Sequence, residues 1–108
     1  MGAVVVKADV AIIGGGIMGS ALAYWLTRLD PNASVVVVER DPTYATASSA
    51  LSAASIRQQF TTPVNIRICQ ASIGFLRQAD ELLEVDGCSV DIGLKERGYL
   101  YLAARDGT

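Results

Sequence analysis

Three glycines and one glutamate have the spacing of a site that binds a dinucleotide. Gly14, Gly16 and Gly19 fit the pattern G-x-G-x-x-G, and Glu39 follows 20 residues after Gly19. In such a pattern the first glycine permits a tight turn after a strand, and the second lets the backbone approach a pyrophosphate. The third lets the following helix lie close to the strands. The pyrophosphate then meets free N–H groups at the helix N-terminus, while the acid accepts the hydroxyls of an adenosine ribose.

The residues around this pattern predict one βαβ unit that positions it. The apolar run 10–13 is typical of a strand buried on both faces. Asp30-Pro31-Asn32 ends the following helix, because proline cannot continue it, and the valines 35–38 favour a second parallel strand. Apolar residues recur on one face of that helix at Met18, Leu22, Trp25 and Leu29. The alternative, a glycine-rich turn in an ordinary α/β domain, explains the glycines but not their spacing to the glutamate.

The segment after the second strand is the other informative stretch. Asp41-Pro42 opens a turn, and Tyr44 is placed at the adenine side. Residues 45–55 are almost all alanine and serine, which suits either a flexible linker or a slim backbone that passes along a cofactor. In the second interpretation the hydroxyls of Ser48 and Ser49 are free to reach phosphate oxygens.

Composition sets bounds on the function. The 108 residues are 51% hydrophobic and 19% charged, which indicates a globular chain that is one small domain or part of one. A net charge of −2 argues against nucleic acid as a partner. The absence of histidine excludes Cys–His and Ser–His pairs, and no metal site is expected.

Cys69 and Cys88 form no C-x-x-C motif, so we expect free thiols in a reducing compartment, cytoplasmic or, in a eukaryote, mitochondrial. Lys7 and Asp9 interrupt the first apolar stretch, so no signal peptide or membrane span is expected.

A long helix and a strand are predicted in the second half. The helix begins at Thr62 as N-cap with Pro63 as its first residue, and Asp86-Gly87 closes it. The run 99–103 predicts a strand. These elements leave parallel strands without neighbours, so the chain resembles the first part of a larger enzyme. The buried face predicted for the helix is Val64, Ile68, Ala71, Phe75, Ala79 and Leu82.

The sequence resembles the D-amino-acid-oxidase-type (DAO) family of FAD-dependent oxidoreductases, which includes sarcosine and dimethylglycine dehydrogenases and glycine oxidase. The resemblance rests on residues 9–19, Val38-Glu39-Arg40, the stretch from Ser48-Ser49 to Arg57, and Gly98-Tyr99-Leu100. It extends to a branch linked to complex I assembly and its bacterial relatives. The resemblance implies an α/β fold: part of a Rossmann-type FAD-binding domain over residues 1–90, and the start of a β-rich substrate domain over 91–108. The remainder of the polypeptide, or an oligomer partner, would be needed for activity, and the 108 residues alone are expected to be inactive.

The resemblance also implies roles for single residues. The three glycines would hold the FAD pyrophosphate, Glu39 the ribose, and Arg40 the adenine edge. Ser52 precedes Ala53-Ala54 where relatives with covalent flavin carry a histidine, so FAD is expected to be held non-covalently. Arg57 resembles an arginine that faces the substrate carboxylate in sarcosine-type enzymes. The residues expected to contact FAD are Ile13, Gly14, Gly16, Ile17, Met18, Gly19, Glu39, Arg40, Ser48, Ser49, Ser52 and Ala53.

Three functions are compatible with these features. The first is oxidation of a C–N bond in a small amine or amino acid, with hydride transfer to the flavin N5. The second is a flavoprotein that serves as an assembly factor or scaffold without turnover. The third is an NAD-dependent dehydrogenase, which the glycine pattern allows but the serine- and alanine-rich segment favours less.

Overall fold

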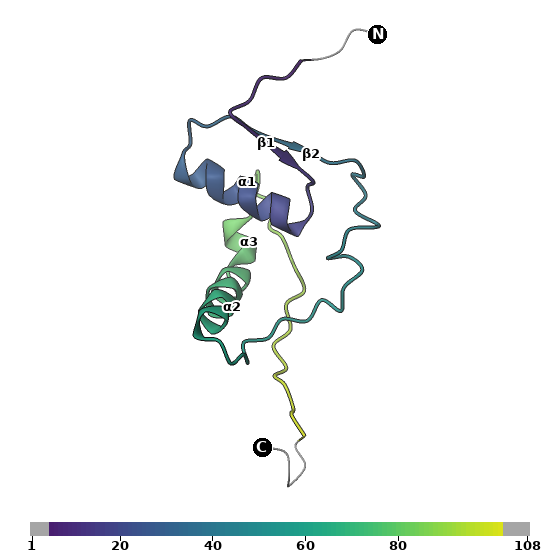
Figure 1. Ribbon diagram of the computed structural model, residues 1–108, viewed down its shortest axis with the longest axis vertical. Coiled ribbons are helices and arrows are strands. Elements are labelled where there is room, and N and C mark those ends of the chain that lie inside the picture. Colours follow the sequence, from purple (N-terminus) through teal and green to yellow (C-terminus); the bar gives the residue numbers. More distant parts are fainter. Residues whose placement is uncertain (1–4, 103–108) are drawn as a thin grey trace. The chain divides into compact units, whose positions relative to one another are not determined.

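The computed structural model describes residues 5–102 and divides into two compact units, Met1–Ala54 and Ser55–Thr108 (Figure 1). The first unit contains strand β1 (Val10–Ile13), helix α1 (Ile17–Leu29) and strand β2 (Val35–Val38). The second contains helices α2 (Pro63–Leu76) and α3 (Ala79–Leu82). The two units are described separately below.

The first unit is the predicted βαβ unit. β1 and β2 pair in parallel, with Val10 opposite Val35 and Ile13 opposite Val38 (Figure 1). The Gly14 N–H donates to the Val38 carbonyl at 2.8 Å, so the pairing continues into the glycine turn. At the other end of the strands, the Ser34 N–H donates to the Asp9 carboxylate at 2.8 Å. The α/β fold class predicted from the sequence is therefore confirmed.

Two of the glycines carry out the mechanical tasks predicted for them. Gly14 has a φ of +98°, a conformation that an L side chain rarely adopts. At residue 19 a Cβ atom would overlap the Gly14 carbonyl oxygen and lie 3.3 Å from the Ile12 Cγ2 atom. α1 can therefore lie against β1 only because residue 19 has no side chain.

The boundaries of α1 also follow from local chemistry. The helix ends at Leu29, and the N–H of its C-cap residue Asp30 donates to the Leu26 carbonyl at 2.9 Å. The Asp30 carboxylate then accepts the Asn32 N–H at 3.0 Å, which starts the turn into β2. The predicted stop at Asp30-Pro31-Asn32 is confirmed.

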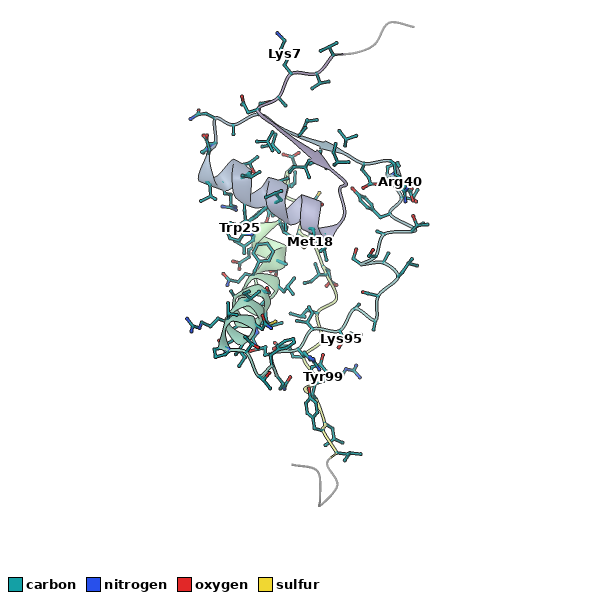
Figure 2. All side chains as sticks on the ribbon, viewed as in Figure 1. Lys7, Met18, Trp25, Arg40, Lys95 and Tyr99 are labelled. Atoms are coloured by element: carbon teal, nitrogen blue, oxygen red, sulfur yellow. The ribbon has the colours of Figure 1, made fainter. Side chains whose placement is uncertain are left out.

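The prediction that the first strand is buried on both faces is wrong for the described residues. Ile12 is buried, but its neighbour Ile13 is 82% exposed. α1 covers one face of the strands, and within this unit no described element covers the other. The apolar face of α1 is uncovered as well, since Met18 is 82% and Trp25 52% exposed (Figure 2).

In the second unit the predicted helix starts where expected but is broken. Thr62 is the N-cap residue and Pro63 the first helical residue of α2, although the Thr62 hydroxyl makes no capping hydrogen bond. α2 ends at Leu76, and the short α3 follows it. The Gln78 N–H bonds to the carbonyl three residues earlier, at Phe75, and Gln78 has left the helical region with φ −114° and ψ 13°. A single helix to residue 86 is therefore wrong, because the backbone leaves the helical conformation at Gln78 and α3 ends at Leu82.

The predicted buried face of this helix is only partly correct. Ala79 is 1% exposed, as expected, and Phe75 and Leu82 are half-buried. Val64, Ile68 and Ala71 are exposed instead. The apolar residues of α2 form two stripes, and the stripe that turns inward is half-buried Ile66, half-buried Cys69, buried Ile73 and half-buried Leu76.

The Asp86-Gly87 pair makes a hairpin turn and does not cap a helix. Both residues have positive φ, 52° and 76°, as a two-residue type I′ turn requires. Val85 and Cys88 exchange two backbone hydrogen bonds of 3.2 and 2.8 Å across it.

The predicted strand over 99–103 is not formed at Tyr99–Leu102, because these residues pair with no described backbone; Ala103 lies outside the described residues. The boundary between domains at residue 90 stays a prediction. Among the described helices, none has the length and apolar character needed to cross a bilayer.

Two glycine substitutions should have opposite effects on stability. Gly19→Ala should lower the free energy of unfolding by about 1–3 kcal/mol, since the methyl group would meet backbone atoms of the glycine turn. Gly74→Ala in α2 meets nothing within 4 Å and should raise it by roughly 0.5–1 kcal/mol through helix propensity. Urea unfolding of the full-length protein measures both. Equal effects of the two substitutions would contradict the close contact at residue 19.

Candidate dinucleotide-binding site

A groove of about 900 Å³ lies in the first unit, beside the glycine turn. Its size is within the range of small-molecule and cofactor sites. The glycine turn and the start of α1 form one side, and the end of β2 with the segment after it forms the other. Met18 on α1 and Arg40 after β2 belong to these two sides (Figure 2).

The groove brings together ten of the twelve residues predicted to contact the cofactor. They are Ile13, Gly14, Gly16, Ile17, Met18, Gly19, Glu39, Arg40, Ser48 and Ser49. Ser52 and Ala53 do not line it. The Ser52 hydroxyl donates to the Ser49 carbonyl at 2.8 Å and accepts the Ala54 N–H at 3.1 Å, so it is engaged in its own turn.

The N-terminus of α1 is open to an anion. Gly16 is the N-cap residue, no side chain caps the helix, and its first turn contains no acidic residue. The first N–H groups of a helix have no partner within the helix and carry partial positive charge. A Cβ at residue 16 would have no atom within 4 Å, so the backbone can be approached closely from this side. These features fit a pyrophosphate.

The Glu39 carboxylate joins the two sides of the groove. One oxygen, Oε2, accepts the Gly15 N–H at 2.7 Å, and the other, Oε1, accepts the Asp41 N–H at 2.9 Å. The Asp41 and Gly15 N–H groups together lower the pKa of Glu39 below the usual value of a glutamate. The carboxylate is therefore charged at neutral pH. Because it can accept about four hydrogen bonds, it retains capacity for ribose hydroxyls.

The segment after Glu39 is held by a second carboxylate. The Asp41 side chain accepts the Thr43 hydroxyl at 2.6 Å and the Thr43 N–H at 3.0 Å, and these bonds lower the pKa of Asp41. The Tyr44 N–H then donates to the Asp41 carbonyl at 3.0 Å. The turn predicted at Asp41-Pro42 is thus present, and it sets the side of the groove that Tyr44 lines.

Several lining residues were not among the predicted contacts: Ile12, Leu22, Val38, Asp41, Tyr44, Thr46 and Ala47. Most of them are neighbours of predicted residues and carry no motif of their own. Asp41 had a signal in the sequence, because the pair Asp41-Pro42 predicts a turn. Tyr44 was expected at the adenine side and does line the groove.

Arg57, the predicted substrate contact, belongs to the second unit. Its guanidinium lies 4.7 Å from the centre of the Phe60 ring. Within residues 5–102 it forms no ion pair; the pair found there joins Arg77 and Glu96. Its positive charge is thus not neutralised by a described carboxylate.

Because the pKa of Glu39 is lowered, we expect its contribution to the free energy of unfolding to depend on pH. A carboxylate whose pKa is lower in the folded than in the unfolded state stabilises the fold above its unfolded pKa, about 4.3. This contribution is lost as the pH falls through the folded pKa. The difference in free energy of unfolding between apo wild type and Glu39→Gln should therefore be constant above about pH 5 and shrink below about pH 4. Urea unfolding at several pH values measures it, and a difference unchanged down to pH 3 would mean that the two N–H bonds are absent.

Comparison with known proteins identifies the family. The family described as FAD dependent oxidoreductase (DAO) matches residues 9–108. FAD-dependent oxidoreductase domain-containing protein 1 of Xenopus laevis is 49% identical over 105 residues, which cover 94% of this chain and 21% of that protein. The protein of the same name from Bos taurus is 46% identical over 105 residues, covering 94% and 22%.

A shorter similarity joins the chain to a second kind of protein. A probable malate:quinone oxidoreductase 3 of Pseudomonas putida is 51% identical over 43 residues, which are 40% of this chain and 8% of that protein. No solved structure matches the chain. The chain spans about a fifth of the length of the relatives that match it almost throughout. The dinucleotide of the matching family is FAD, and this chain belongs to the DAO family of FAD-dependent oxidoreductases.

Proposed function

We propose that the chain is the FAD-binding N-terminal part of an oxidoreductase that oxidises a C–N bond in a small amine or amino acid. The observation that carries the proposal is the groove in which the glycine turn, the open N-terminus of α1 and the charged Glu39 meet. FAD, when bound, supplies the hydride acceptor. Since the chain spans about a fifth of its relatives, turnover belongs to the full-length protein.

Each part of the groove has a task toward FAD. The N–H groups at the start of α1 bind the pyrophosphate, and Glu39 accepts the ribose hydroxyls. Arg40 lines the same groove, and its assigned contact is the edge of the adenine. The hydroxyls of Ser48 and Ser49 line the same groove and are available to the phosphate and ribityl oxygens. The chain thus binds and orients the cofactor rather than taking part in the chemical step.

We infer that FAD is held non-covalently. The chain contains no histidine, and Ser52 occupies the position before Ala53-Ala54 where covalent relatives carry one. Ser52 also lies outside the residues that line the groove.

Acid precipitation of the full-length holoprotein should therefore release yellow flavin into the supernatant. The control is a protein with known covalent flavin, treated in the same way. Flavin that stays with the pellet would contradict a non-covalent cofactor, and a colourless preparation that cannot be loaded with FAD would contradict the proposed function itself.

The position and charge of Arg57 favour a substrate that carries a carboxylate. The segment that precedes it is tied to Tyr99, whose hydroxyl donates to the Ile56 carbonyl at 2.9 Å and shares a 2.5 Å hydrogen bond with the Ser55 hydroxyl. Stacking over the Phe60 ring restricts the guanidinium without neutralising it. A guanidinium whose charge no described carboxylate neutralises is suited to bind a carboxylate with two parallel hydrogen bonds.

Substitution of this arginine should act on substrate binding. In the full-length enzyme, Arg57→Gln should raise KM for an amino acid substrate roughly tenfold or more, with a smaller effect on kcat and none on the FAD content. Arg67→Gln, on the exposed side of α2, is the matched control and should change neither constant. Steady-state kinetics are measured with amino acids and with the corresponding amines that lack the carboxylate. A contact between Arg57 and the substrate carboxylate should raise KM for the amino acids only. Equal changes in KM for both substrate types would contradict the carboxylate contact.

A hydroxy acid is the second candidate substrate, and the similarity to malate:quinone oxidoreductases favours it. The two families of substrate share a carboxylate, so Arg57 fits both. Reduction of the bound flavin under anaerobic conditions by sarcosine or glycine on one side, and by malate on the other, separates them. Reduction by neither group would favour a flavoprotein that serves as an assembly factor without turnover.

A further inference from the structure

The middle residue of the glycine turn, Gly15, lies close to the Tyr44 side chain, so that a side chain here would meet the Tyr44 phenol. A Cβ at Gly15 would lie 2.9 Å from the Tyr44 hydroxyl oxygen, 3.3 Å from the Glu39 Cβ and 3.4 Å from the Val37 Cγ1. Gly15 is buried, and its φ is not in the left-handed region. Glycine at residue 15 therefore leaves room for the Tyr44 hydroxyl in this position, and backbone conformation does not require it. The neighbouring Gly16 differs, because nothing lies within 4 Å of its Cβ position.

The Tyr44 side chain reaches this point from a constrained turn. Tyr44 has a φ of 57°, which is unfavourable for a residue with a large side chain. Such a conformation persists only where the surroundings fix it. Here the Tyr44 N–H bonds to the Asp41 carbonyl at 3.0 Å, and the Asp41 carboxylate is held by Thr43.

The Glu39 carboxylate links Gly15 to the turn that carries Tyr44. Glu39 binds the Gly15 N–H on one side and the Asp41 N–H on the other. Asp41 starts the turn that carries Tyr44, and the Tyr44 hydroxyl oxygen lies 2.9 Å from the position that a Cβ at residue 15 would take. Tyr44 also lines the groove next to Glu39. A side chain at residue 15 would displace the Tyr44 phenol from this position, and truncation of Tyr44 would remove it.

We propose that Tyr44 is a positioning and specificity residue for the adenosine half of FAD, and that Gly15 must be glycine to leave room for its phenol. The aromatic ring forms the wall against which the adenosine lies while Glu39 holds its ribose. The proposal rests on the proposed function, since it assigns part of the same groove. It adds a residue that the glycine pattern does not include, and it explains the second of three consecutive glycines by a side chain that comes later in the chain.

The test uses the full-length apoprotein and measures the Kd of FAD and the Kd of ADP, which contains only the adenosine half. Tyr44→Ala should weaken both ligands by the same factor, on the order of fivefold or more, as expected from loss of an aromatic wall beside a base. Gly15→Ala should weaken both in the same way, because the methyl group displaces the Tyr44 phenol. Tyr101→Ala, an exposed tyrosine of the second unit, is the matched control and should change neither Kd.

Double variants distinguish the proposal from a general loss of folding. Gly15→Ala combined with Tyr44→Ala should bind FAD no more weakly than Tyr44→Ala, because both changes remove the same wall. Gly15→Ala combined with Tyr44→Phe should recover affinity, since the atom nearest to the new methyl group is gone.

Effects of Gly15→Ala and Tyr44→Ala that multiply in the first double variant would overturn the proposal, and so would weaker FAD binding with unchanged ADP binding. Neither result would contradict the proposed function, because the wild-type protein would still bind FAD. A wild-type protein that binds FAD and ADP with no effect of any Tyr44 substitution would overturn it as well. A wild-type protein that binds neither ligand would overturn the proposed function together with this inference.

Discussion

The hydrogen bond from the Gly15 N–H to the Glu39 carboxylate is the interaction on which the candidate site depends. It spans 2.7 Å and joins residues 24 positions apart, at the end of β2 and in the turn after β1. Without it, the turn and the segment after β2 would share only the strand pairing that ends between Gly14 and Val38. With it, the open helix N-terminus and the carboxylate that we propose as the ribose contact line one groove. The Glu39 carboxylate thus holds the two sides of the groove together, and it is also the group expected to bind the ribose hydroxyls.

The close approach of α1 to β1 is the second constraint, and it explains why a small βαβ unit can present such a groove. The absence of a side chain at Gly19 allows the first turns of the helix to lie against Gly14 and Ile12, and no side chain caps the helix N-terminus at Gly16. The apolar surface that remains is large, however: among the described hydrophobic residues only Ile12, Ile73 and Ala79 are buried. Since the relatives are about five times as long, the faces of β1 and α1 that are exposed here are suited to pack against further parts of such a protein.

The first half of this structure could be predicted from the sequence because its determinants are local. A glycine that requires positive φ, a proline after an aspartate and four successive valines each fix one boundary. The second half could not, for two physical reasons. The break after Leu76 depends on one backbone bond from Gln78 to Phe75, which an apolar periodicity does not reveal. The run at Tyr99 has the composition of a strand, but a strand also needs a partner, and none of the described residues supplies one. In the site, the spacing of the glycines to Glu39 predicted residues that line one groove, whereas the close approach at Gly15 depends on a fold that brings Tyr44 back to the turn.

The most direct test of this account is a titration of the full-length apoprotein with FAD, comparing wild type, Glu39→Ala and Glu81→Ala. Glu39→Ala should raise the Kd of FAD roughly tenfold or more, because it removes the charge-assisted bonds to the ribose and the anchor of the glycine turn. Glu81→Ala removes an exposed glutamate in α3 and should leave the Kd unchanged. Equal affinities of all three proteins would show that adenosine does not bind beside Glu39 and would contradict the account.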